Sequence, residues 1–343
     1  MGLALGSKEK KVFNMKILVT GGTGLLGAAV GEKLIEKGLE PVLFDIAPRD
    51  EQIAKIKDKA EVIRGNILEL SELLEVIREK KVHGIIHAAA ILLNAAREMP
   101  YEAIRVNILG TANILEAARI EGMEKVIFSG SAAVYHFSIY RDRPITENDP
   151  IFPNDIYAST KLACEYLGEN YSKLYGTKFI SLRFASIYGP SYPQGGYAGS
   201  WLHPLLTAMV TGKSHYQIKR SPRRFNQYIY VQDAANALVK ALLSDTQSNV
   251  FNIGEGKLRT FDEVISQVQM LFPKQKIEIV EGPKKDASPI DWVFPYDISL
   301  AEKELGFKVE FPLEKALSHY IQWLREHLRN KQSFQSLNSV TLP

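Results

Sequence analysis

A tyrosine and a lysine spaced four residues apart, Tyr157 and Lys161, could form an acid–base pair. That spacing places both side chains on one face of a helix. A free phenol has a pKa of about 10 and is a poor base at neutral pH. An ammonium ~4 Å away would favour the phenolate by up to ~4 kcal/mol at an effective dielectric of about 20. The pKa of Tyr157 would then approach the range in which acid–base catalysis works best, although surface helices also produce such pairs.

Ser131 is a candidate to hold the reacting oxygen of a substrate. It lies just after residues 125–129, an apolar run that we predict to be a strand. A hydroxyl at the C-terminal end of a strand faces the ligand crevice of an open α/β sheet. Ser131 could therefore hold a substrate hydroxyl or carbonyl oxygen against Tyr157, and Ser129 in the same turn is the alternative.

A glycine-rich segment, residues 20–27 (TGGTGLLG), follows the first predicted strand and opens a predicted helix. Its glycines lack Cβ atoms, so backbone N–H groups can approach a diphosphate, and the helix N-terminus adds partial positive charge. A tight turn alone would also favour glycine, but a position between strand and helix is what a dinucleotide site requires. The expected cofactor contacts in this segment are Gly21, Thr23, Gly24, Leu25, Leu26 and Gly27.

Asp45 ends the second predicted strand, 18 residues beyond Gly27. A carboxylate at this point can accept hydrogen bonds from both hydroxyls of an adenosine ribose, and it repels a 2′-phosphate. We therefore expect NAD rather than NADP. Arg49 lies close by in sequence, and a solvated strand end is the alternative interpretation of Asp45.

The elements that would position these residues alternate between short β-branched runs and amphipathic helices. This alternation predicts a parallel sheet covered by helices on both faces. The predicted strands are 15–20, 41–45, 61–64, 84–88, 125–129, 179–183 and 228–231, and the predicted helices are 25–37, 69–79, 101–119, 157–175 and 233–243.

The predicted fold class is α/β, a Rossmann-type doubly wound parallel sheet with a smaller C-terminal α+β substrate domain. We expect residues 15–183 to form the NAD-binding domain and residues 184–330 to be mainly the substrate-binding domain, because the chain becomes rich in Gly, Pro and aromatic residues after Tyr188. Residues 228–250 are expected to return to the first domain.

Taken together, the motifs resemble the extended short-chain dehydrogenase/reductase superfamily and, within it, the NAD-dependent epimerase/dehydratase family. They appear in the expected order and on the expected elements over about residues 15–329. Besides the residues above, the resemblance rests on His87-Ala88-Ala89, Asn107, Val134-Tyr135 and Arg183–Pro190.

The resemblance implies roles for individual residues. Tyr157 would be the acid–base residue, Lys161 would bind the nicotinamide ribose and lower the pKa of the tyrosine, and Ser131 would orient the reacting oxygen. The backbone of Ala88 and Ala89 would lie beside the cofactor, with Asn107 in a supporting hydrogen-bonded role. The segment Gly65-Asn66-Ile67 matches the family's adenine contact, with Asn66 where the family usually has Asp; Asn66 can still bond an adenine edge, and Ile67 is expected beside it.

The resemblance also implies a homodimer that pairs the helices holding Asn107 and Tyr157 with their symmetry mates. Apolar residues on these helices would permit such a four-helix bundle, but the core of a single chain would need them too. The residues concerned are Ile104, Ile108, Ala112, Leu115, Leu162 and Leu167.

At some positions this chain departs from the family pattern, and these differences limit which of the family's reactions it can catalyse. Sugar-nucleotide dehydratases carry an Asp-Glu pair after the catalytic hydroxyl, whereas this chain has Ala132-Ala133, so no acid or base is available for dehydration. Uridine-diphosphate-sugar epimerases have Asn and Arg in the segments that match Ser186 and Asn226. A basic cluster could replace this diphosphate clamp, although a solvated loop is equally open; it comprises Lys219, Arg220, Arg223 and Arg224.

Two chemistries remain, and the same catalytic residues serve both. An epimerase would keep NAD bound and return the hydride to the other face of a ketone, while a dehydrogenase would release NADH. We favour epimerisation of a sugar or nucleotide-sugar, with net oxidation of a smaller sugar, uronate or hydroxy acid as the alternative. A non-catalytic NAD-binding regulator is a third possibility. The expected substrate contacts are Ser131, Ala132, Ser186, Arg223 and Arg224.

Composition and charge argue against several other classes. With 42 Lys and Arg against 39 Asp and Glu, the net charge of +3 is too small to favour nucleic acid or an anionic membrane. The longest apolar run, near 85–96, contains His87 and Asn94 and is too short to span a membrane. One cysteine, Cys164, favours a reducing compartment, so we expect a cytoplasmic protein. His83 and His87 have no third ligand at metal spacing, so no metal is expected.

Overall fold

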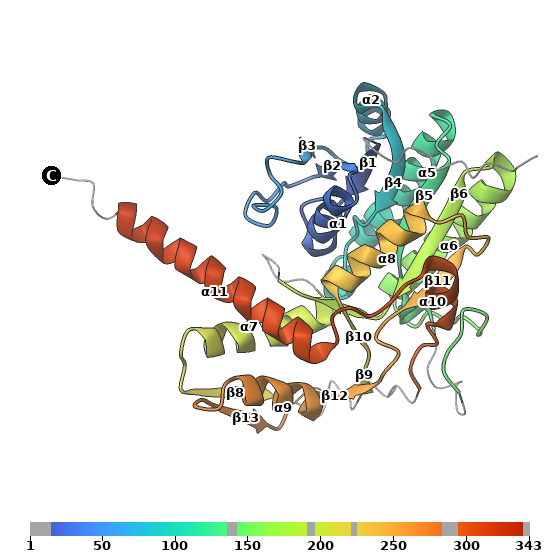
Figure 1. The fold of residues 1–343 in the computed structure, drawn as a ribbon. Coiled ribbons are helices and arrows are strands. Elements are labelled where there is room, and N and C mark those ends of the chain that lie inside the picture. The colour runs from blue at the N-terminus through green and yellow to red at the C-terminus, as the bar shows by residue number, and fades with distance from the viewer. Residues whose placement is uncertain (1–14, 136–142, 191–195, 221–224, 283–293, 339–343) are drawn as a thin grey trace, which may run out of the picture.

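The computed structural model describes residues 15–135, 143–190, 196–220, 225–282 and 294–338 of the 343-residue chain (Figure 1). Its centre is a seven-stranded sheet in the order β3-β2-β1-β4-β5-β6-β11, with every neighbouring pair parallel. The strands are β1 Lys16–Thr20, β2 Glu40–Asp45, β3 Glu61–Arg64, β4 Val82–His87, β5 Lys125–Ser131, β6 Lys178–Phe184 and β11 Val250–Ile253. The predicted parallel α/β sheet is confirmed.

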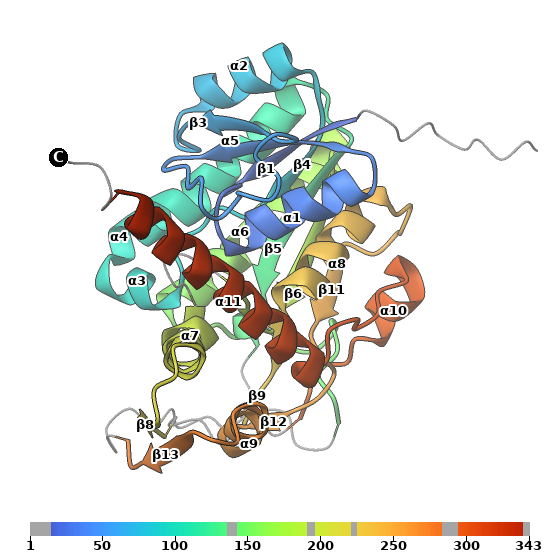
Figure 2. The same cartoon turned by 60° about the vertical axis from the view of Figure 1, so that its left-hand side comes forward.

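Helices cover both faces of this sheet and enclose two hydrophobic cores. Alternate residues of β1 point to opposite faces, as a strand requires: Ile17 and Val19 lie in one core and Leu18 in the other. The first core is closed by α1 (Leu25–Glu36) and α8 (Val231–Leu243), and the second by α2 (Leu70–Lys80), α5 (Gly110–Ile120) and α6 (Ile156–Tyr175). Figure 2 shows α1 and α8 on the near face of the sheet.

The segment before α5 differs from the single helix expected over residues 101–119. It forms α3 (Leu93–Glu98), α4 (Pro100–Ala103) and a turn of π-helix, η1 (Ile104–Leu109), which continues into α5. Pro100 stands in the first turn of α4, where its missing N–H costs nothing. The π turn contains Asn107 and turns its side chain away from solvent; such turns concentrate at functional sites.

The remainder of the chain forms small sheets and helices next to the C-terminal edge of the main sheet. β7 (Ser186–Tyr188) pairs with β10 (Tyr228–Tyr230), β9 (Phe225–Asn226) with β12 (Arg259–Thr260), and β8 (His215–Lys219) with β13 (Lys276–Val280). The helices here are α7 Gly196–Val210, α9 Phe261–Leu271, α10 Ser299–Leu305 and α11 Leu313–Asn338. No helix in the described ranges is long and apolar enough to cross a membrane.

The chain crosses back into the main sheet after β10. Helix α8 packs on α1, and β11 pairs with β6 in the register Phe251↔Leu182. The division of the chain into an NAD-binding and a substrate-binding domain near residue 184 stays a prediction.

Candidate active site

Four strands bring the predicted residues to one edge of the sheet. Because β1, β2, β4 and β5 are parallel, their C-terminal ends lie together, which is where open α/β sheets bind ligands. The glycine turn follows β1, Asp45 ends β2, Ala88 and Ala89 follow β4, and Ser131 ends β5.

The glycine turn is closely packed. Gly21 has a φ of +64°, and a Cβ there would lie 2.9 Å from the Cα of Ala89. A Cβ on Gly27 would lie 2.2 Å from the Gly21 carbonyl oxygen, so both positions require glycine. At Gly24 a Cβ would lie 3.2 Å from the Gly21 carbonyl oxygen, a tight contact that a small shift would relieve.

Gly24 is the N-cap of α1, and no side chain caps this end of the helix. The first turn also carries no acidic residue. The backbone N–H groups at the start of α1, around Leu25 and Leu26, are therefore available to an anion, as a diphosphate site requires. The turn fits the diphosphate of a dinucleotide.

Asp45 faces this turn directly. Its Oδ2 accepts hydrogen bonds from the backbone N–H of Thr23 (3.0 Å) and from the Thr23 hydroxyl (2.8 Å), and its Oδ1 accepts one from the N–H of Ala47 (3.1 Å). The structure therefore brings Thr23 and Asp45 together beside the helix N-terminus. A carboxylate at this position suits a ribose diol.

Asn66 and Ile67 lie just after β3, and the contacts that the structure shows for them are with other residues of this chain. The Oδ1 of Asn66 accepts from the N–H of Leu68 (3.0 Å), which tightens the turn before α2. Ile67 is buried, and its carbonyl accepts from the side chain of Asn113 (3.0 Å). Contact between these two residues and adenine stays a prediction.

Tyr157, Lys161 and Ser131 meet at the start of α6. The carboxylate of Asp155 caps this helix by accepting from the N–H of Ala158 (2.8 Å). The side chains of Tyr157 and Ser131 face each other, and the Ser131 hydroxyl acts to lower the pKa of the phenol. Lys161 Nζ donates to the carbonyl of Ser129 (2.8 Å). The structure thus distinguishes the two serines: Ser131 presents its side chain to the tyrosine, and Ser129 presents its backbone to the lysine.

Burial dominates the electrostatics of this pair. It raises the pKa of Tyr157 to about 12, although the neighbouring Ser131 hydroxyl acts to lower it, and it lowers the pKa of Lys161 to about 8. The ammonium of Lys161 is not among the groups that shift the pKa of Tyr157 here, so the expectation that Lys161 lowers that pKa stays a prediction. The ammonium is directed to the Ser129 carbonyl and lies 5.8 Å from the centre of the tyrosine ring.

Asn107 links the end of β4 to the catalytic helix. Its Oδ1 accepts from the N–H of Ile91 (2.8 Å), and its Nδ2 donates to the Ile91 carbonyl (3.1 Å) and to the hydroxyl oxygen of Thr160 (2.9 Å). Thr160 in turn donates to the carbonyl of Tyr157 (2.8 Å). Sequence reasoning missed Thr160; its place between Tyr157 and Lys161 is a signal that could have identified it.

The structure places the residues that were predicted to contact substrate in different surroundings. Ala132 is buried in a short 3-10 turn, η2 (Ala132–Val134), directly after Ser131. The hydroxyl of Ser186 donates to the Oδ1 of Asn226 (3.3 Å). The two positions that depart from the family pattern are therefore paired with each other. Arg223 and Arg224 lie outside the described residues.

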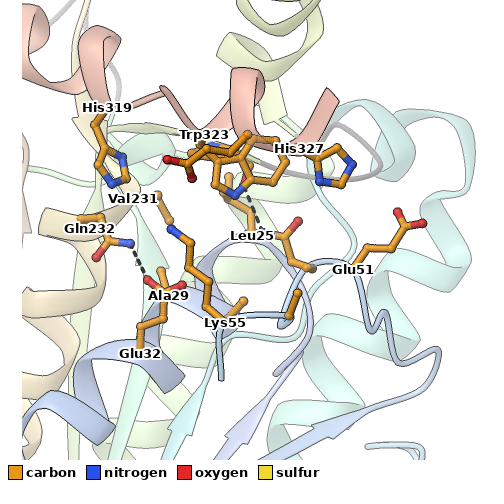
Figure 3. A pocket seen from close by; sticks show the side chains of 15 residues that line it. Leu25, Ala29, Glu32, Glu51, Lys55, Val231, Gln232, His319, Trp323 and His327 are labelled. Carbon is orange, nitrogen blue, oxygen red and sulfur yellow. Dashed lines mark hydrogen bonds between the residues drawn. The ribbon is translucent and has the colours of Figure 1, made fainter. Parts of the chain in front are cut away.

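A cavity of about 140 Å³ lies on the outer side of α1 (Figure 3). Residues of α1, α8 and α11 and the segment 51–55 form its walls, and the ring of Trp323 stacks on His327 at 4.9 Å. Gln232 donates to Glu32 (2.9 Å) across one wall. Neither Tyr157 nor Ser131 lines this cavity, so it is separate from the reacting groups. The described residues also contain no group of three or more His, Cys, Asp or Glu able to hold a metal.

A parallel sheet with a glycine turn, a ribose-type carboxylate and a Tyr/Lys/Ser cluster defines a dinucleotide-dependent enzyme of the extended short-chain dehydrogenase/reductase type. Comparison with known proteins agrees. Residues 17–254 match the model of the NAD dependent epimerase/dehydratase family. The chain therefore belongs to the NAD-dependent epimerase/dehydratase family, and NAD is its cofactor.

Similar proteins include enzymes of nucleotide-sugar metabolism. A UDP-glucose 4-epimerase of Halalkalibacterium halodurans is 28% identical over 331 residues, which cover 91% of this chain and 96% of that protein. A dTDP-4-dehydro-6-deoxyglucose reductase of Escherichia coli is 26% identical over 321 residues, covering 90% and 97%. The crystal structure of UDP-glucose 4-epimerase with UDP-glucose from Thermotoga maritima has a TM-score of 0.81 and 25% identity, covering 92% of this chain and all of that one.

Proposed function

We propose that the protein is an NAD-dependent epimerase that inverts one carbinol carbon of a sugar or nucleotide-sugar through a transient keto intermediate. The observation that carries this proposal is the cluster of Tyr157, Ser131 and the buried Lys161, whose Nζ donates to the Ser129 carbonyl, at the sheet edge that also holds the glycine turn. Similarity to UDP-glucose 4-epimerases supports the substrate class.

The cofactor would be held by residues at the ends of β1 to β4. The residues that we propose are Gly21, Thr23, Gly24, Leu25, Leu26, Gly27, Asp45, Asn66, Ile67, Ala88, Ala89 and Asn107, together with Tyr157 and Lys161. These residues would hold NAD, which would supply the hydride-transfer chemistry that oxidises a carbinol carbon and then reduces the resulting ketone.

Tyr157 would take the hydroxyl proton as the carbon–hydrogen bond breaks and would return it in the second half of the reaction. Ser131 would hold the same oxygen, because its hydroxyl faces the phenol of Tyr157. A phenol with a pKa of about 12 keeps its proton at neutral pH. We therefore expect the Lys161 ammonium to turn from the Ser129 carbonyl towards the phenol when Tyr157 acts as a base. The protonated phenol, which burial favours, serves the return step.

Dehydration is disfavoured at this site. Ala132 and Ala133 follow Ser131 and offer neither an acid for a leaving hydroxyl nor a base for the adjacent carbon. A purely regulatory role is also disfavoured, because every chemical role at the site is filled.

Net oxidation by a dehydrogenase is the second candidate, and one observation favours it. Ser186 and Asn226 are bonded to each other and are both uncharged, so this pair provides no cation for a diphosphate. Such a site suits a smaller sugar, uronate or hydroxy acid. The two candidates share Tyr157, Lys161 and Ser131 and differ in whether NADH leaves.

The products of the reaction distinguish an epimerase from a dehydrogenase. The NAD-loaded protein is incubated with UDP-glucose, other nucleotide-sugars and free sugars, while isomers are followed by NMR and NADH by absorbance. Isomer formation without net NADH is the expected result. Stoichiometric NADH would instead establish the dehydrogenase. Tyr157→Phe serves as the control, because it preserves the ring but removes the hydroxyl that both candidates need.

A further inference from the structure

His87, at the end of β4, is a fully buried titratable residue to which the reaction assigns no role. Only 1% of it is exposed. Both ring nitrogens have hydrogen-bond partners: Nδ1 lies 2.6 Å from the hydroxyl of Thr20, and Nε2 lies 3.0 Å from the hydroxyl of Thr111. A histidine with both nitrogens bonded in a dry interior is held in one orientation.

The partners also determine which nitrogen carries the proton. The Thr111 hydroxyl donates to the backbone carbonyl of Asn107 (2.5 Å). A carbonyl only accepts, so the single hydroxyl proton of Thr111 is committed there. Thr111 must accept from Nε2–H of His87, and the neutral ring therefore accepts from Thr20 at Nδ1. Burial, reinforced by the charge of Lys161, lowers the pKa of His87 to about 3, so the ring stays neutral at physiological pH.

This chain of bonds joins the two halves of the cofactor site. Thr20 is the last residue of β1 and directly precedes Gly21, and its oxygen also accepts from the N–H of Ala89 (3.3 Å). At the other end of the chain, Asn107 lies in the π turn and supports the catalytic helix through Thr160. The backbones of Gly21 and Ala89 are in close contact, because a Cβ on Gly21 would lie only 2.9 Å from the Ala89 Cα.

We propose that His87 is a positioning residue for the dinucleotide, which fixes the spacing between the glycine turn and the π turn of Asn107. It touches neither substrate nor cofactor in this role and acts through Thr20 and Thr111. The proposal concerns cofactor binding and does not depend on whether the enzyme is an epimerase or a dehydrogenase. Filling of the core by His87 is the competing explanation.

The affinity for NAD distinguishes a positioning role of His87 from simple filling of the core. The protein, freed of any copurified dinucleotide, is titrated with NAD by calorimetry, and its Tm is measured in parallel. His87→Leu is expected to raise the Kd for NAD at least tenfold. His203→Leu is the matched control, because His203 is also buried but bonds to Tyr320 (2.7 Å) away from the site. It should lower the Tm and change the Kd less than twofold. An unchanged Kd in His87→Leu, or equal losses in both variants, overturns the proposal.

Threonine variants test the same chain if His87→Leu does not fold. Thr20→Val and Thr111→Val each remove one hydroxyl with little change in volume, and each should raise the Kd for NAD about threefold or more. Thr20→Ser and Thr111→Ser keep the hydroxyl and should restore binding to near the original value. Valine variants that bind NAD as tightly as the unaltered protein contradict the positioning role. Failure of the epimerase assay would leave these Kd values unaffected.

Discussion

At the scale of single residues, the site holds its reactive groups in protonation states that burial favours. Lys161 is almost fully buried and its pKa is lowered to about 8, while the pKa of Tyr157 is raised to about 12. Both shifts oppose the charged forms that proton transfer uses. The site is therefore built at a cost in stability, as functional sites commonly are.

Tyr157→Phe tests the acid–base role. We expect turnover to fall by about 10²–10⁴-fold, the usual contribution of a positioned acid–base group, with NAD binding little changed. Steady-state rates and the Kd for NAD give the two values. Ser131→Ala should lose rate to a smaller extent, because it removes a hydrogen bond and leaves the proton carrier. Turnover of Tyr157→Phe at the unaltered rate rules out the proposed chemistry.

Lys161→Met tests the cost of the buried ammonium through pH. The pKa of this lysine is about 8 in the folded chain, below its ordinary value of 10.5. Between these values the unfolded chain binds more protons, so stability rises with pH, by up to about 3 kcal/mol. The Tm of the unaltered protein should therefore rise relative to that of Lys161→Met as the pH increases from 7 to about 10. A constant Tm difference contradicts the lowered pKa.

Asp45→Ala tests the choice of cofactor. Removal of the carboxylate should raise the Kd for NAD by about tenfold or more, since hydrogen bonds to charged groups are worth about 1.5–3 kcal/mol. The Kd for NADP should change much less, because the carboxylate repels its 2′-phosphate. Asp45 also bonds to Thr23, so some loss common to both is expected. If the affinities for NAD and NADP fell equally, Asp45 would support the glycine turn but would not select the cofactor.

At the scale of elements, the strands and helices of the first half follow their sequence patterns closely. The predicted strand 61–64 matches β3, and the predicted helix 157–175 begins one residue after Ile156, the first residue of α6. Local signals suffice for the central strands β1, β2, β4 and β5, because each is apolar enough to form a buried parallel strand, and β3 at the sheet edge is only partly buried. The π turn around Asn107 has no such signal. Its geometry depends on bonds to Ile91 and Thr160, which come from other elements.

Alanine variants of the glycine turn can distinguish an effect on the stability of the fold from an effect on NAD binding. Gly24 has φ −76° and ψ 176°, which alanine can adopt, and a Cβ there would lie 3.2 Å from the Gly21 carbonyl oxygen, which must shift by a few tenths of an ångström. Gly24→Ala should lower the Tm by only a few degrees yet raise the Kd for NAD at least tenfold, because Gly24 is the N-cap of α1, where no side chain caps the helix. Gly27→Ala should lose stability as well, since its Cβ would overlap the Gly21 carbonyl. Unchanged NAD binding in Gly24→Ala would move the diphosphate away from this turn.

At the scale of the whole molecule, sequence reasoning covered the main sheet better than the rest. The small sheets contain strands of two to five residues, and their pairings join distant segments, as in β8 with β13. Such pairings depend on tertiary context rather than on local propensity. The substrate is less predictable still, because Ser186 and Asn226 form a contact that neither position indicates alone.

We propose that the protein is a homodimer formed through η1, α5 and α6. Of the residues expected at this interface, Ile104 is exposed, whereas Leu115 is buried in the core of the single chain and cannot contribute. Other large apolar side chains on these segments are also exposed, among them Leu109, Ile156 and Tyr166, and Tyr101 is exposed on the neighbouring α4. An exposed group of this kind is typical of an interface.

Ile104→Asp should therefore convert the dimer to a monomer while the fold is retained. Size-exclusion chromatography with light scattering measures the mass, and Met270→Asp is the control, because Met270 is exposed on α9 instead. A monomeric unaltered protein, or equal dissociation of both variants, contradicts this interface.

The most direct test of the proposed chemistry follows one hydrogen atom. A substrate deuterated at the reacting carbinol carbon is converted by the NAD-loaded enzyme in ordinary water, and the product is analysed by mass spectrometry and NMR. Transfer of hydride to the cofactor and back predicts that the epimerised product keeps the deuterium on the same carbon. Exchange of the deuterium for solvent hydrogen, or its release with free NADH, would contradict the account.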